Sequence, residues 1–480
     1  MAKFDYNAVV IGGGTAGLIS ANILAQAKTK VALFEEHLMG GDCLNTGCVP
    51  SKALIASAKV MKHARESHKF GIKITGTVEA DFPEIMRQIH RIIAYIAPID
   101  SRERYRGLGV DCFEERARIV GPHQIQAADR LITAEHIVIA SGASPIVPPI
   151  PGLSDMEPLH SNNLWDLKEL PKRLLVLGSG PIGCELAQAF SHLGSDVTIA
   201  SLDMAPLAKE DPEVCEFMQR RFANEGIHLL LGARVERFSK DVNGNSVEYE
   251  LAGKREKHFF DRVLVAVGRK ANSAGIGLET IGVELCPNGT IKVNDYLQST
   301  QKKVWACGDV AGPYQFTHMA AHQAGYVAMN ILASPFKRFA VDYSQVPWVT
   351  YTDPEVARVG LNETEAKSKS ISCEITRFDF SHQDRAITER ENEGFVKVLT
   401  HPKSGVILGA TIVGTHAGEL LSEFSLALKQ KMALKQIAST IHPYPTLSEA
   451  NKSVATEWRK KRIPTKLLGI ANSYFKWRRS

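Results

Sequence analysis

Residues 7–17 read NAVVIGGGTAG, and this stretch decides the fold of the first part of the chain. The continuous apolar run 7–11 is typical of a parallel strand that is buried on both faces. It leads directly into three glycines and then into an alanine-rich helix pattern. In such a pattern Gly12 makes the turn, Gly14 lets the backbone approach a pyrophosphate, and Gly17 allows close helix packing. The stretch therefore predicts a Rossmann-like dinucleotide-binding unit.

An acidic residue completes this pattern. A second predicted strand, 31–34, ends directly before Glu35. A carboxylate about twenty residues after the glycines accepts a hydrogen bond from a ribose hydroxyl. A glycine pattern alone is a weak signal, whereas strand, turn, helix, strand and acid in this order are specific.

The same pattern returns later in the chain. Residues 174–177 predict a strand, Gly178, Gly180 and Gly183 form the loop, and 185–193 predict the helix. Two dinucleotide sites in one chain are far more specific than either site alone. They suggest a relay of electrons between cofactors rather than a simple dehydrogenation.

The choice of nicotinamide nucleotide depends on the residues after the next strand, 197–200. An acid at the strand end favours NAD, and a nearby Arg accommodates the 2′-phosphate of NADP. Neither stands at the expected place here. Asp203 would repel a 2′-phosphate, whereas Lys209 would offset that repulsion. We expect NAD(H) to be favoured over NADP(H).

Residues 40–52, GGDCLNTGCVPSK, hold two cysteines separated by four residues, Cys43 and Cys48. The glycines and Pro50 interrupt regular structure, and a helix pattern follows from Ala53. Cys48 is therefore predicted at the mouth of a helix, where unpaired N–H groups and the helix dipole favour a thiolate. The alternative is a pair of buried structural cysteines.

Length and composition are those of an ordinary globular protein. At 480 residues the chain exceeds one hydrophobic core, so roughly two to four domains are expected. No run of about 18 apolar residues predicts a membrane span, and the first residues do not resemble a signal peptide. We expect a cytoplasmic location, where a cysteine pair is more often redox-active than structural.

Charge is distributed unevenly along the chain. The net charge is +5, but residues 452–480 contain nine Lys or Arg and one Glu, a local charge of +8. The first 451 residues therefore carry −3 and give no reason to expect nucleic-acid binding. Four prolines between Pro145 and Pro151 predict a stiff domain boundary, and the pattern changes again from Tyr343.

Together these motifs give the sequence a family resemblance. It resembles the class I pyridine nucleotide–disulfide oxidoreductases, the family of dihydrolipoyl dehydrogenase, glutathione reductase and mercuric reductase. The resemblance runs from about residue 4 to about residue 460. It is carried by GGDCLNTGCVPSK, both glycine fingerprints, VAVGRKAN at 265–272, ACGD at 306–309 and YPTLSE at 444–449.

The resemblance implies an α/β fold with two Rossmann-like domains and a C-terminal α+β dimerisation domain. The FAD domain would be discontinuous, 1–150 and 273–345, with the NAD(P) domain 151–272 inserted between its halves. The dimerisation domain would be 346–462, followed by a basic amphipathic tail, 463–480. Members of the family are homodimers whose active sites take residues from both chains.

The resemblance also implies roles for single residues. Cys48 would lie against the flavin, Cys43 would attack the substrate, and Lys52 would stand beside flavin N5, paired with Glu185. The alternative for that pair is a plain surface salt bridge, which contributes little. The implied catalytic residues are Cys43, Cys48, Lys52, Glu185, Tyr444 and Glu449. The implied cofactor-binding residues are Gly12, Gly14, Gly17, Glu35, Lys52, Ser141, Gly142, Gly178, Gly180, Gly183, Gly268, Arg269, Gly308 and Asp309.

One position departs from the family pattern. Disulfide reductases of this family have an acid–base histidine immediately before Pro-Thr, with a glutamate five residues later. Here Glu449 is present, but Tyr444 takes the place of the histidine. A phenol with a pKa near 10 is a poor base at neutral pH. His442 could substitute for it, or could be a structural histidine.

The sequence favours one function and leaves two alternatives open. The first is a dihydrolipoyl dehydrogenase-like enzyme that acts on a small-molecule or protein-bound thiol or disulfide. The second is a mercuric reductase-like enzyme that reduces a metal ion or another small oxidant, which Tyr444 favours. The sequence has no cysteine after Cys373 and no N-terminal metal-binding module, so a dedicated mercury enzyme is not expected. The third is a non-catalytic, redox-responsive binding flavoprotein.

The basic tail allows two interpretations. Within 464–480, aliphatic and aromatic residues alternate with Lys and Arg. Such a helix can make a peripheral contact with an anionic membrane surface. The favoured interpretation is an ordinary C-terminal helix that docks on the partner subunit of a homodimer.

Overall fold

The structure is a computed structural model that describes residues 4–242 and 244–479. The chain forms two compact units, which consist of residues 1–204 with 222–342, and 205–221 with 343–480. Among the described residues, no helix is both long enough and apolar enough to cross a bilayer. The two units do not separate the predicted FAD and NAD(P) domains, and they group 205–221 with the end of the chain. The predicted domain boundaries therefore stay predictions.

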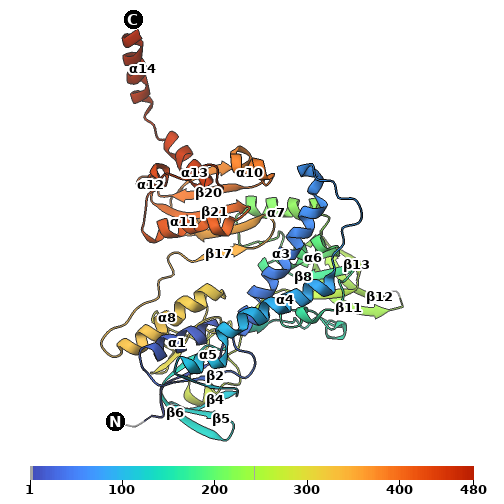
Figure 1. Ribbon diagram of the computed structural model, residues 1–480, viewed down its shortest axis with the longest axis vertical. Coiled ribbons are helices and arrows are strands. Elements are labelled where there is room, and N and C mark those ends of the chain that lie inside the picture. Colours follow the sequence, from blue (N-terminus) through green and yellow to red (C-terminus); the bar gives the residue numbers. More distant parts are fainter. Residues whose placement is uncertain (1–3, 243, 480) are drawn as a thin grey trace. The chain divides into compact units, whose positions relative to one another are not determined.

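The first unit is built on a seven-stranded sheet in the order β3-β2-β1-β6-β5-β4, with β16 paired to β6 (Figure 1). Its strands are β1 (Tyr6–Ile11), β2 (Val31–Phe34), β3 (Val110–Phe113), β4 (Ala117–Gly121), β5 (Gln124–Ala127), β6 (Arg130–Ile139) and β16 (Val304–Ala306). Strands β3, β2, β1, β6 and β16 are parallel, whereas β4 and β5 run antiparallel beside the start of β6.

The central strand of this sheet is buried on both faces. Val10 packs in one apolar core with residues of α1 (Thr15–Gln26) and α8 (Thr317–Ala333), whereas Val9 and Ile11 pack in another core on the opposite face. Successive side chains of a strand point to opposite faces, so a strand covered on both sides must be apolar throughout. The predicted buried parallel strand is confirmed.

The second glycine fingerprint belongs to a smaller parallel sheet in the order β10-β9-β8-β14. Its strands are β8 (Arg173–Leu177), β9 (Asp196–Ser201), β10 (His228–Leu231) and β14 (Arg262–Val265), and α6 (Pro181–Leu193) follows β8. An antiparallel meander of β11 (Arg234–Asp241), β12 (Gly244–Leu251) and β13 (Lys254–Phe260) shares its apolar core. The predicted α/β fold with two Rossmann-like sheets is confirmed.

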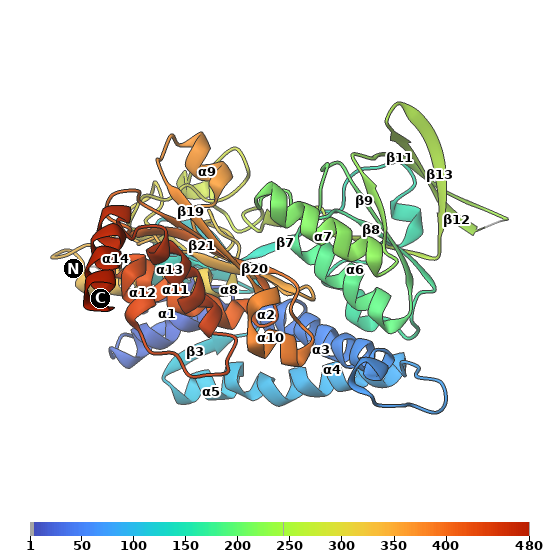
Figure 2. The same cartoon turned by 90° about the horizontal axis from the view of Figure 1, so that it is seen from above.

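Several elements of the first unit connect or flank these two sheets. Helix α3 packs against α4 and against α6, and Figure 2 shows α3 and α4 side by side. Strands β7 and β15 pair as an antiparallel ribbon. These elements are α2 (Gly41–Asn45), α3 (Cys48–Arg65), α4 (Phe82–Ile96), α5 (Arg102–Gly107), β7 (Ala143–Pro145) and β15 (Arg269–Ala271).

The second unit is built on a five-stranded antiparallel sheet in the order β17-β18-β21-β20-β19. Its strands are β17 (Pro347–Thr350), β18 (Glu355–Gly360), β19 (Glu374–Asp379), β20 (Phe395–Thr400) and β21 (Ile407–Gly414). Its helices are α9 (Glu363–Ser368), α10 (Asp384–Glu389), α11 (Ala417–Lys429), α12 (Leu434–Ser439), α13 (Glu449–Lys460) and α14 (Thr465–Arg479). Most of α7 (Pro212–Asn224) also belongs to this unit.

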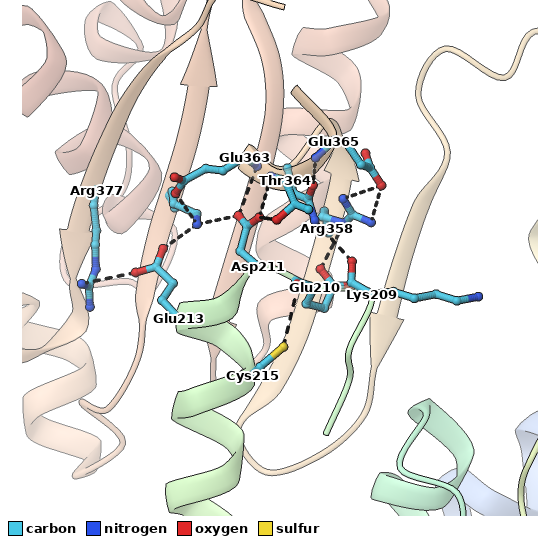
Figure 3. A network of polar contacts seen from close by, with 12 residues as sticks. Lys209, Glu210, Asp211, Glu213, Cys215, Arg358, Glu363, Thr364, Glu365 and Arg377 are labelled. Atoms are coloured by element: carbon cyan, nitrogen blue, oxygen red, sulfur yellow. Dashed lines mark hydrogen bonds and ion pairs between the residues drawn. The ribbon is translucent and has the colours of Figure 1, made fainter. Parts of the chain in front are cut away.

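A buried lysine fastens the segment before α7 to this sheet. The Lys397 side chain on β20 is 1% exposed, and its Nζ lies 2.6 Å from Asp211, 2.5 Å from Glu213 and 2.7 Å from Glu363. Figure 3 shows the carboxylates of Asp211, Glu213 and Glu363 gathered in this way. A buried ammonium is tolerated only where carboxylates replace its water shell.

A second buried cation lies beside this group. The Arg358 side chain on β18 is 2% exposed and lies 3.1 Å from Glu210 and 3.0 Å from Glu365 (Figure 3). Its guanidinium also stacks 4.1 Å from the ring centre of Trp348, whose indole N–H donates to Glu210. The two cations therefore hold residues 210–213 on the sheet of the second unit.

Candidate active site

The two cysteines lie at a junction of two helices in the first unit. Cys43 is in α2, and Cys48 is the first residue of α3, with Gly47 as its N-cap. The backbone N–H groups of Thr46 and Gly47 donate to the carbonyl of Asp42 at 2.9 and 2.6 Å, which closes the turn between the helices. The structure thus places Cys48 at a helix N-terminus, where the dipole stabilises a thiolate.

Both cysteines are free thiols, and the Cys43 thiol donates a hydrogen bond to Cys48. This bond lowers the pKa of Cys48 to about 6, with help from Thr317 and Lys52 and against the effects of burial and Glu185. The same bond, together with burial, raises the pKa of Cys43. At neutral pH the pair therefore holds one thiolate on Cys48 and one proton on Cys43.

Lys52 follows Cys48 by one helical turn and pairs with Glu185. Its Nζ lies 2.8 Å from Glu185 Oε2, and the Glu185 side chain, on α6, is only 7% exposed. The lysine brings a positive charge close to the thiolate. Because Glu185 is buried, the pair is not the plain surface salt bridge that the sequence left open.

Two further residues at this site come from α8 and carried no signal in the sequence. The Oγ1 atom of Thr317 lies 3.3 Å from Cys48 Sγ. The side-chain amide of Gln323 is fully buried, accepts from the N–H of Gly308 and donates to the carbonyl of Gly312, both at 2.7 Å. Thr317 and Cys48 are 269 positions apart, so no local pattern would predict their contact.

The first glycine loop fits a dinucleotide. Gly12 has φ +110°, and a Cβ there would lie 2.3 Å from the carbonyl oxygen of Ala140. A Cβ on Gly17 would lie 1.8 Å from the carbonyl oxygen of Gly12, so the helix can approach the strand only without one. Gly14 is the N-cap of α1 and supplies no side chain to the first N–H groups. These groups suit a pyrophosphate.

Glu35 is held in place by backbone groups. Its carboxylate accepts hydrogen bonds from the N–H groups of Gly13 at 2.6 Å and His37 at 2.8 Å. Each carboxylate oxygen has a further lone pair. The side chain is therefore oriented and can still accept a hydrogen bond from a ribose hydroxyl.

The cysteine loop and the first glycine loop touch each other. The N–H of Gly40 donates to the carbonyl of Gly13 at 2.9 Å. A Cβ on Gly41, which has φ +57°, would lie 2.6 Å from the Cα of Gly14. A cofactor bound along the glycine loop would therefore lie beside the cysteines.

Arg269 joins the cysteine loop to Asp309. It pairs with Asp42, lies 3.9 Å from Asp309, and donates to the carbonyl of Ala143 at 2.6 Å. Burial raises the pKa of Asp309 to about 6, against the opposing charge of Arg269. A half-buried carboxyl of this kind, beside the positive φ of Gly308, suits a hydrogen bond to a bound polar group.

The predicted residues Ser141, Gly142 and Gly268 lie where the chain passes between the two sheets. Ser141 Oγ donates to the carbonyl of Asn272 at 2.8 Å, and the N–H of Asn272 donates to the carbonyl of Gly142 at 2.9 Å. The carbonyl of Gly268 accepts from the N–H of Ile146 at 3.0 Å. In this structure the Ser141 hydroxyl and the backbone carbonyls of Gly142 and Gly268 hold the crossing segments together.

The second glycine loop repeats the geometry of the first. A Cβ on Gly178 would lie 2.6 Å from the carbonyl oxygen of Ala266, and one on Gly183 would lie 2.1 Å from the carbonyl oxygen of Gly178. Gly180 is the N-cap of α6 without a side-chain cap. Both glycine loops therefore open onto helix N-termini that suit a phosphate group.

Asp203 is tied to the end of β9. Its N–H donates to the Ser201 hydroxyl at 3.1 Å, and Ser179 in the glycine loop donates to the same oxygen at 2.9 Å. Lys209 belongs to the second unit, where its carbonyl accepts from Asn362.

Tyr444 and His442 have different partners within the second unit. Tyr444 is 70% exposed, and its hydroxyl donates to Asp384 Oδ2 at 2.9 Å. This bond and the charge of Asp384 raise the pKa of Tyr444. The His442 ring lies 3.0 Å from Glu423 through Nε2 and 3.2 Å from the carbonyl of Thr440 through Nδ1. Both ring nitrogens are thus engaged.

Glu449 is the first residue of α13, five residues after Tyr444. Its N–H donates to the carbonyl of Thr446 at 3.3 Å. An acid in the first turn of a helix is favoured by the dipole.

Comparisons with known proteins agree with this geometry. Residues 6–324 match the family described as pyridine nucleotide-disulphide oxidoreductase, and residues 346–455 match its dimerisation domain. The chain is 35% identical to dihydrolipoyl dehydrogenase of Chlamydia muridarum over 453 residues, which cover 92% of this chain and 95% of that protein. It is 33% identical to mercuric reductase of Lysinibacillus sphaericus over 456 residues, which cover 95% of this chain and 83% of that protein.

A solved structure is similar over nearly the whole chain. The Cu(II) complex of RclA, an HOCl-induced flavoprotein disulfide reductase from Escherichia coli, has a TM-score of 0.83 and 27% sequence identity. The similarity covers 94% of this chain and 99% of that one. The chain belongs to the class I pyridine nucleotide–disulfide oxidoreductases, an FAD- and nicotinamide-dependent family.

Proposed function

We propose that this enzyme passes electrons from a nicotinamide nucleotide through FAD to the Cys43–Cys48 pair, and from the pair to a thiophilic metal ion such as Cu(II). The observation that carries the choice of acceptor is the hydrogen bond from Tyr444 to Asp384 at the place of the family's acid–base histidine. In a homodimer of the family type, this position would face the cysteines of the partner subunit.

The residues around the cysteines support the transfer of electrons. Bound FAD would supply a two-electron carrier between the nicotinamide and the disulfide. Cys48 then holds a negative charge, which its helix N-terminus, Thr317 and Lys52 stabilise. Cys43 keeps the proton and would be the thiol that reacts with the acceptor. Glu185 fixes the position of Lys52 through their 2.8 Å contact.

The choice of acceptor depends on proton transfer. When a thiolate attacks a disulfide substrate, one of the two substrate sulfurs leaves as a thiolate. That leaving thiolate must take up a proton, which an acid–base side chain supplies. The Tyr444 phenol donates its proton to a hydrogen bond with Asp384, and its pKa is raised. It is therefore a poor acid–base group for this proton transfer. A metal ion displaces the thiol protons itself when it binds. The Cys43 thiol and the Cys48 thiolate then lose two electrons and the one proton on Cys43, the disulfide re-forms, and two Cu(II) ions become two Cu(I) ions.

The second candidate is a dihydrolipoyl dehydrogenase-like reaction on a small-molecule or protein-bound thiol or disulfide. It is favoured by the similarity to dihydrolipoyl dehydrogenase over nearly the whole chain and by Glu449, which follows Tyr444 by five residues. In that case another group, such as His442, would have to move the proton. The contacts of His442 with Glu423 and Thr440 argue against this role.

We further propose that the enzyme is a cytoplasmic homodimer that prefers NAD(H). The match to the dimerisation domain supports the dimer. Asp203, two residues after the end of β9, would repel the 2′-phosphate of NADP. A reducing compartment would keep the thiols available between turnovers.

One experiment separates these functions. The flavoenzyme is reduced anaerobically with NADH or NADPH, and Cu(II), Hg(II), lipoamide or glutathione disulfide is then added while flavin absorbance is recorded. We expect re-oxidation by Cu(II) and little by either disulfide. A Cys43→Ser variant should still be reduced by NADH but should no longer reduce Cu(II). Re-oxidation by lipoamide alone would establish the second candidate, and re-oxidation by no acceptor would indicate a binding flavoprotein.

A further inference from the structure

The helix α14 presents an exposed surface that the reaction does not use. Between residues 468 and 479 only Ala471 is half-buried, and every other side chain is exposed. The exposed fraction reaches 66% for Ile470, 53% for Phe475 and 73% for Trp477. Large apolar side chains of this kind rarely gather on an exposed helix unless they contact something else.

These apolar residues share one side of the helix. They recur at spacings of three and four residues, the spacing of neighbours on a helix surface, as Leu468, Ala471 and Phe475, and as Ile470, Tyr474 and Trp477. The ring of Tyr474 lies 5.4 Å from that of Phe475 and 6.1 Å from that of Trp477. The aromatic rings therefore form one continuous patch.

The opposite side of α14 is polar and basic. At 3.6 residues per turn it carries Asn472, Ser473, Lys476 and Arg479. Arg478 lies among the apolar positions in the last turn, with its guanidinium 6.0 Å from the ring centre of Tyr474. A long side chain near a helix end can carry its charge to the edge of an apolar surface.

The chain immediately before α14 is anchored to the second unit. Trp458 on α13 is 6% exposed, and the guanidinium of Arg462 stacks 4.0 Å from its ring centre. Arg462 also donates to the carbonyl of Pro402 at 2.6 Å. The helix α14 thus begins at Thr465, three residues after the anchored Arg462. The segment before it, 459–462, is itself basic.

We propose that α14 binds the surface of an anionic lipid bilayer, lying along the interface with Ile470, Tyr474, Phe475 and Trp477 inserted between the headgroups. Residues 452–480 carry nine cations and one anion, which complements a surface of acidic lipids. Tyr and Trp are the side chains that favour the boundary between headgroups and acyl chains. The enzyme would then supply electrons at a membrane.

A second copy of this chain fits the same surface less well. Two copies of α14 packed together would bring like charges close to each other. The remaining 451 residues carry only −3, so they offer little negative charge to a helix with this many cations. Charge complementarity therefore favours the lipid surface.

The proposal is tested by co-sedimentation of the full-length flavoenzyme with vesicles. The vesicles are phosphatidylcholine alone or phosphatidylcholine mixed with phosphatidylglycerol, at low and at high salt. We expect binding only to the anionic vesicles, and less binding at high salt because salt screens the attraction.

Variants of α14 separate the two faces. Lys476→Gln with Arg479→Gln should weaken binding about 25-fold, since each charge contributes about fivefold near an anionic surface. Phe475→Ser with Trp477→Ser should abolish binding. Ser473→Ala, a neutral change on the polar face, is the matched control and should bind as the parent does. Reduction of the flavin by NADH should be the same in all of these proteins.

Two results would overturn the proposal. One is binding that does not depend on anionic lipid or on Phe475 and Trp477. The other is that the parent protein binds no vesicles, while light scattering gives the Phe475→Ser, Trp477→Ser variant half the molar mass of the parent. This second result would make the apolar face a contact between copies of the chain.

Discussion

The Sγ atom of Cys48 lies 3.3 Å from the Oγ1 atom of Thr317, although 269 positions separate the two residues in the sequence. Each is the first residue of its helix, Cys48 of α3 and Thr317 of α8. The N-termini of two helices therefore meet at one sulfur atom. Because both dipoles and the hydroxyl favour a negative charge there, this arrangement stabilises the Cys48 thiolate.

Replacing Thr317 by Val should raise the pKa of Cys48 above its present value of about 6. A hydrogen bond to a charged group contributes about 1.5–3 kcal/mol, so we expect a rise of about one unit or more. The rate of alkylation of the dithiol enzyme by iodoacetamide, measured against pH, reports this value. Thr317→Ser keeps the hydroxyl and should leave the midpoint unchanged. An unchanged midpoint in the Val variant would mean that the hydroxyl does not act on the thiolate.

Replacing Lys52 by Met should have two effects. It removes a positive charge one turn from Cys48 and should raise the pKa of that thiol. It also removes the 2.8 Å partner of the buried Glu185 carboxylate, which should cost about 2 kcal/mol of unfolding free energy. Alkylation against pH measures the first effect, and urea unfolding measures the second. In a Lys52→Met, Glu185→Gln double variant much of the stability should return, and no recovery would show that the pair is not coupled.

The group around Lys397 should make stability depend on pH at both extremes. Burial lowers the pKa of Lys397, but three carboxylates outweigh burial and raise it. Burial raises the pKa of Asp211, but its bonds from Lys397, Thr364 and Glu363 outweigh burial and lower it. The lowered Asp211 contributes stability above its unfolded pKa of about 3.9, which is lost as the pH falls. The raised Lys397 contributes stability below its unfolded pKa of about 10.4, which is lost as the pH rises.

Lys397→Met should therefore lower the unfolding free energy by about 3–5 kcal/mol near neutral pH, because it leaves buried carboxylates without their cation. Thermal unfolding of the second unit, followed across pH, measures this loss. Arg377→Met, which removes an exposed cation 3.5 Å from Glu213, is a control and should cost less than about 1 kcal/mol. Equal losses in the two variants would contradict the assignment.

Tyr444→His should raise the rate of disulfide reduction. A positioned acid–base group contributes about 10²–10⁴-fold, so we expect at least a hundredfold gain with lipoamide. Re-oxidation by Cu(II) should stay within about twofold, because the metal ion displaces the thiol protons itself. Tyr444→Phe, which removes only the hydroxyl, is the control and should not gain activity with lipoamide. If the His variant gains nothing, the substrate pocket rather than the missing base excludes disulfides.

The sequence predicted those features that short stretches of backbone determine. Gly12 and Gly178 adopt positive φ, and Gly17 and Gly183 sit where a Cβ would collide with a carbonyl oxygen. These demands fall on single residues at fixed spacings, so a pattern in the sequence reveals them. The start of α3 at Cys48 followed in the same way from glycines, a proline and the helix pattern after them.

Tertiary structure alone decided which distant side chains meet. Thr317 reaches Cys48, Asp384 holds the Tyr444 hydroxyl, Glu423 engages His442, and Lys397 fastens the segment 210–213 to the sheet of the second unit. These contacts depend on how helices and sheets pack, and packing is fixed by burial summed over many residues rather than by any local motif. The sequence by itself therefore determined the fold, the cysteine pair and the family. The packing of the folded chain decided where the charges and protons of the site are held.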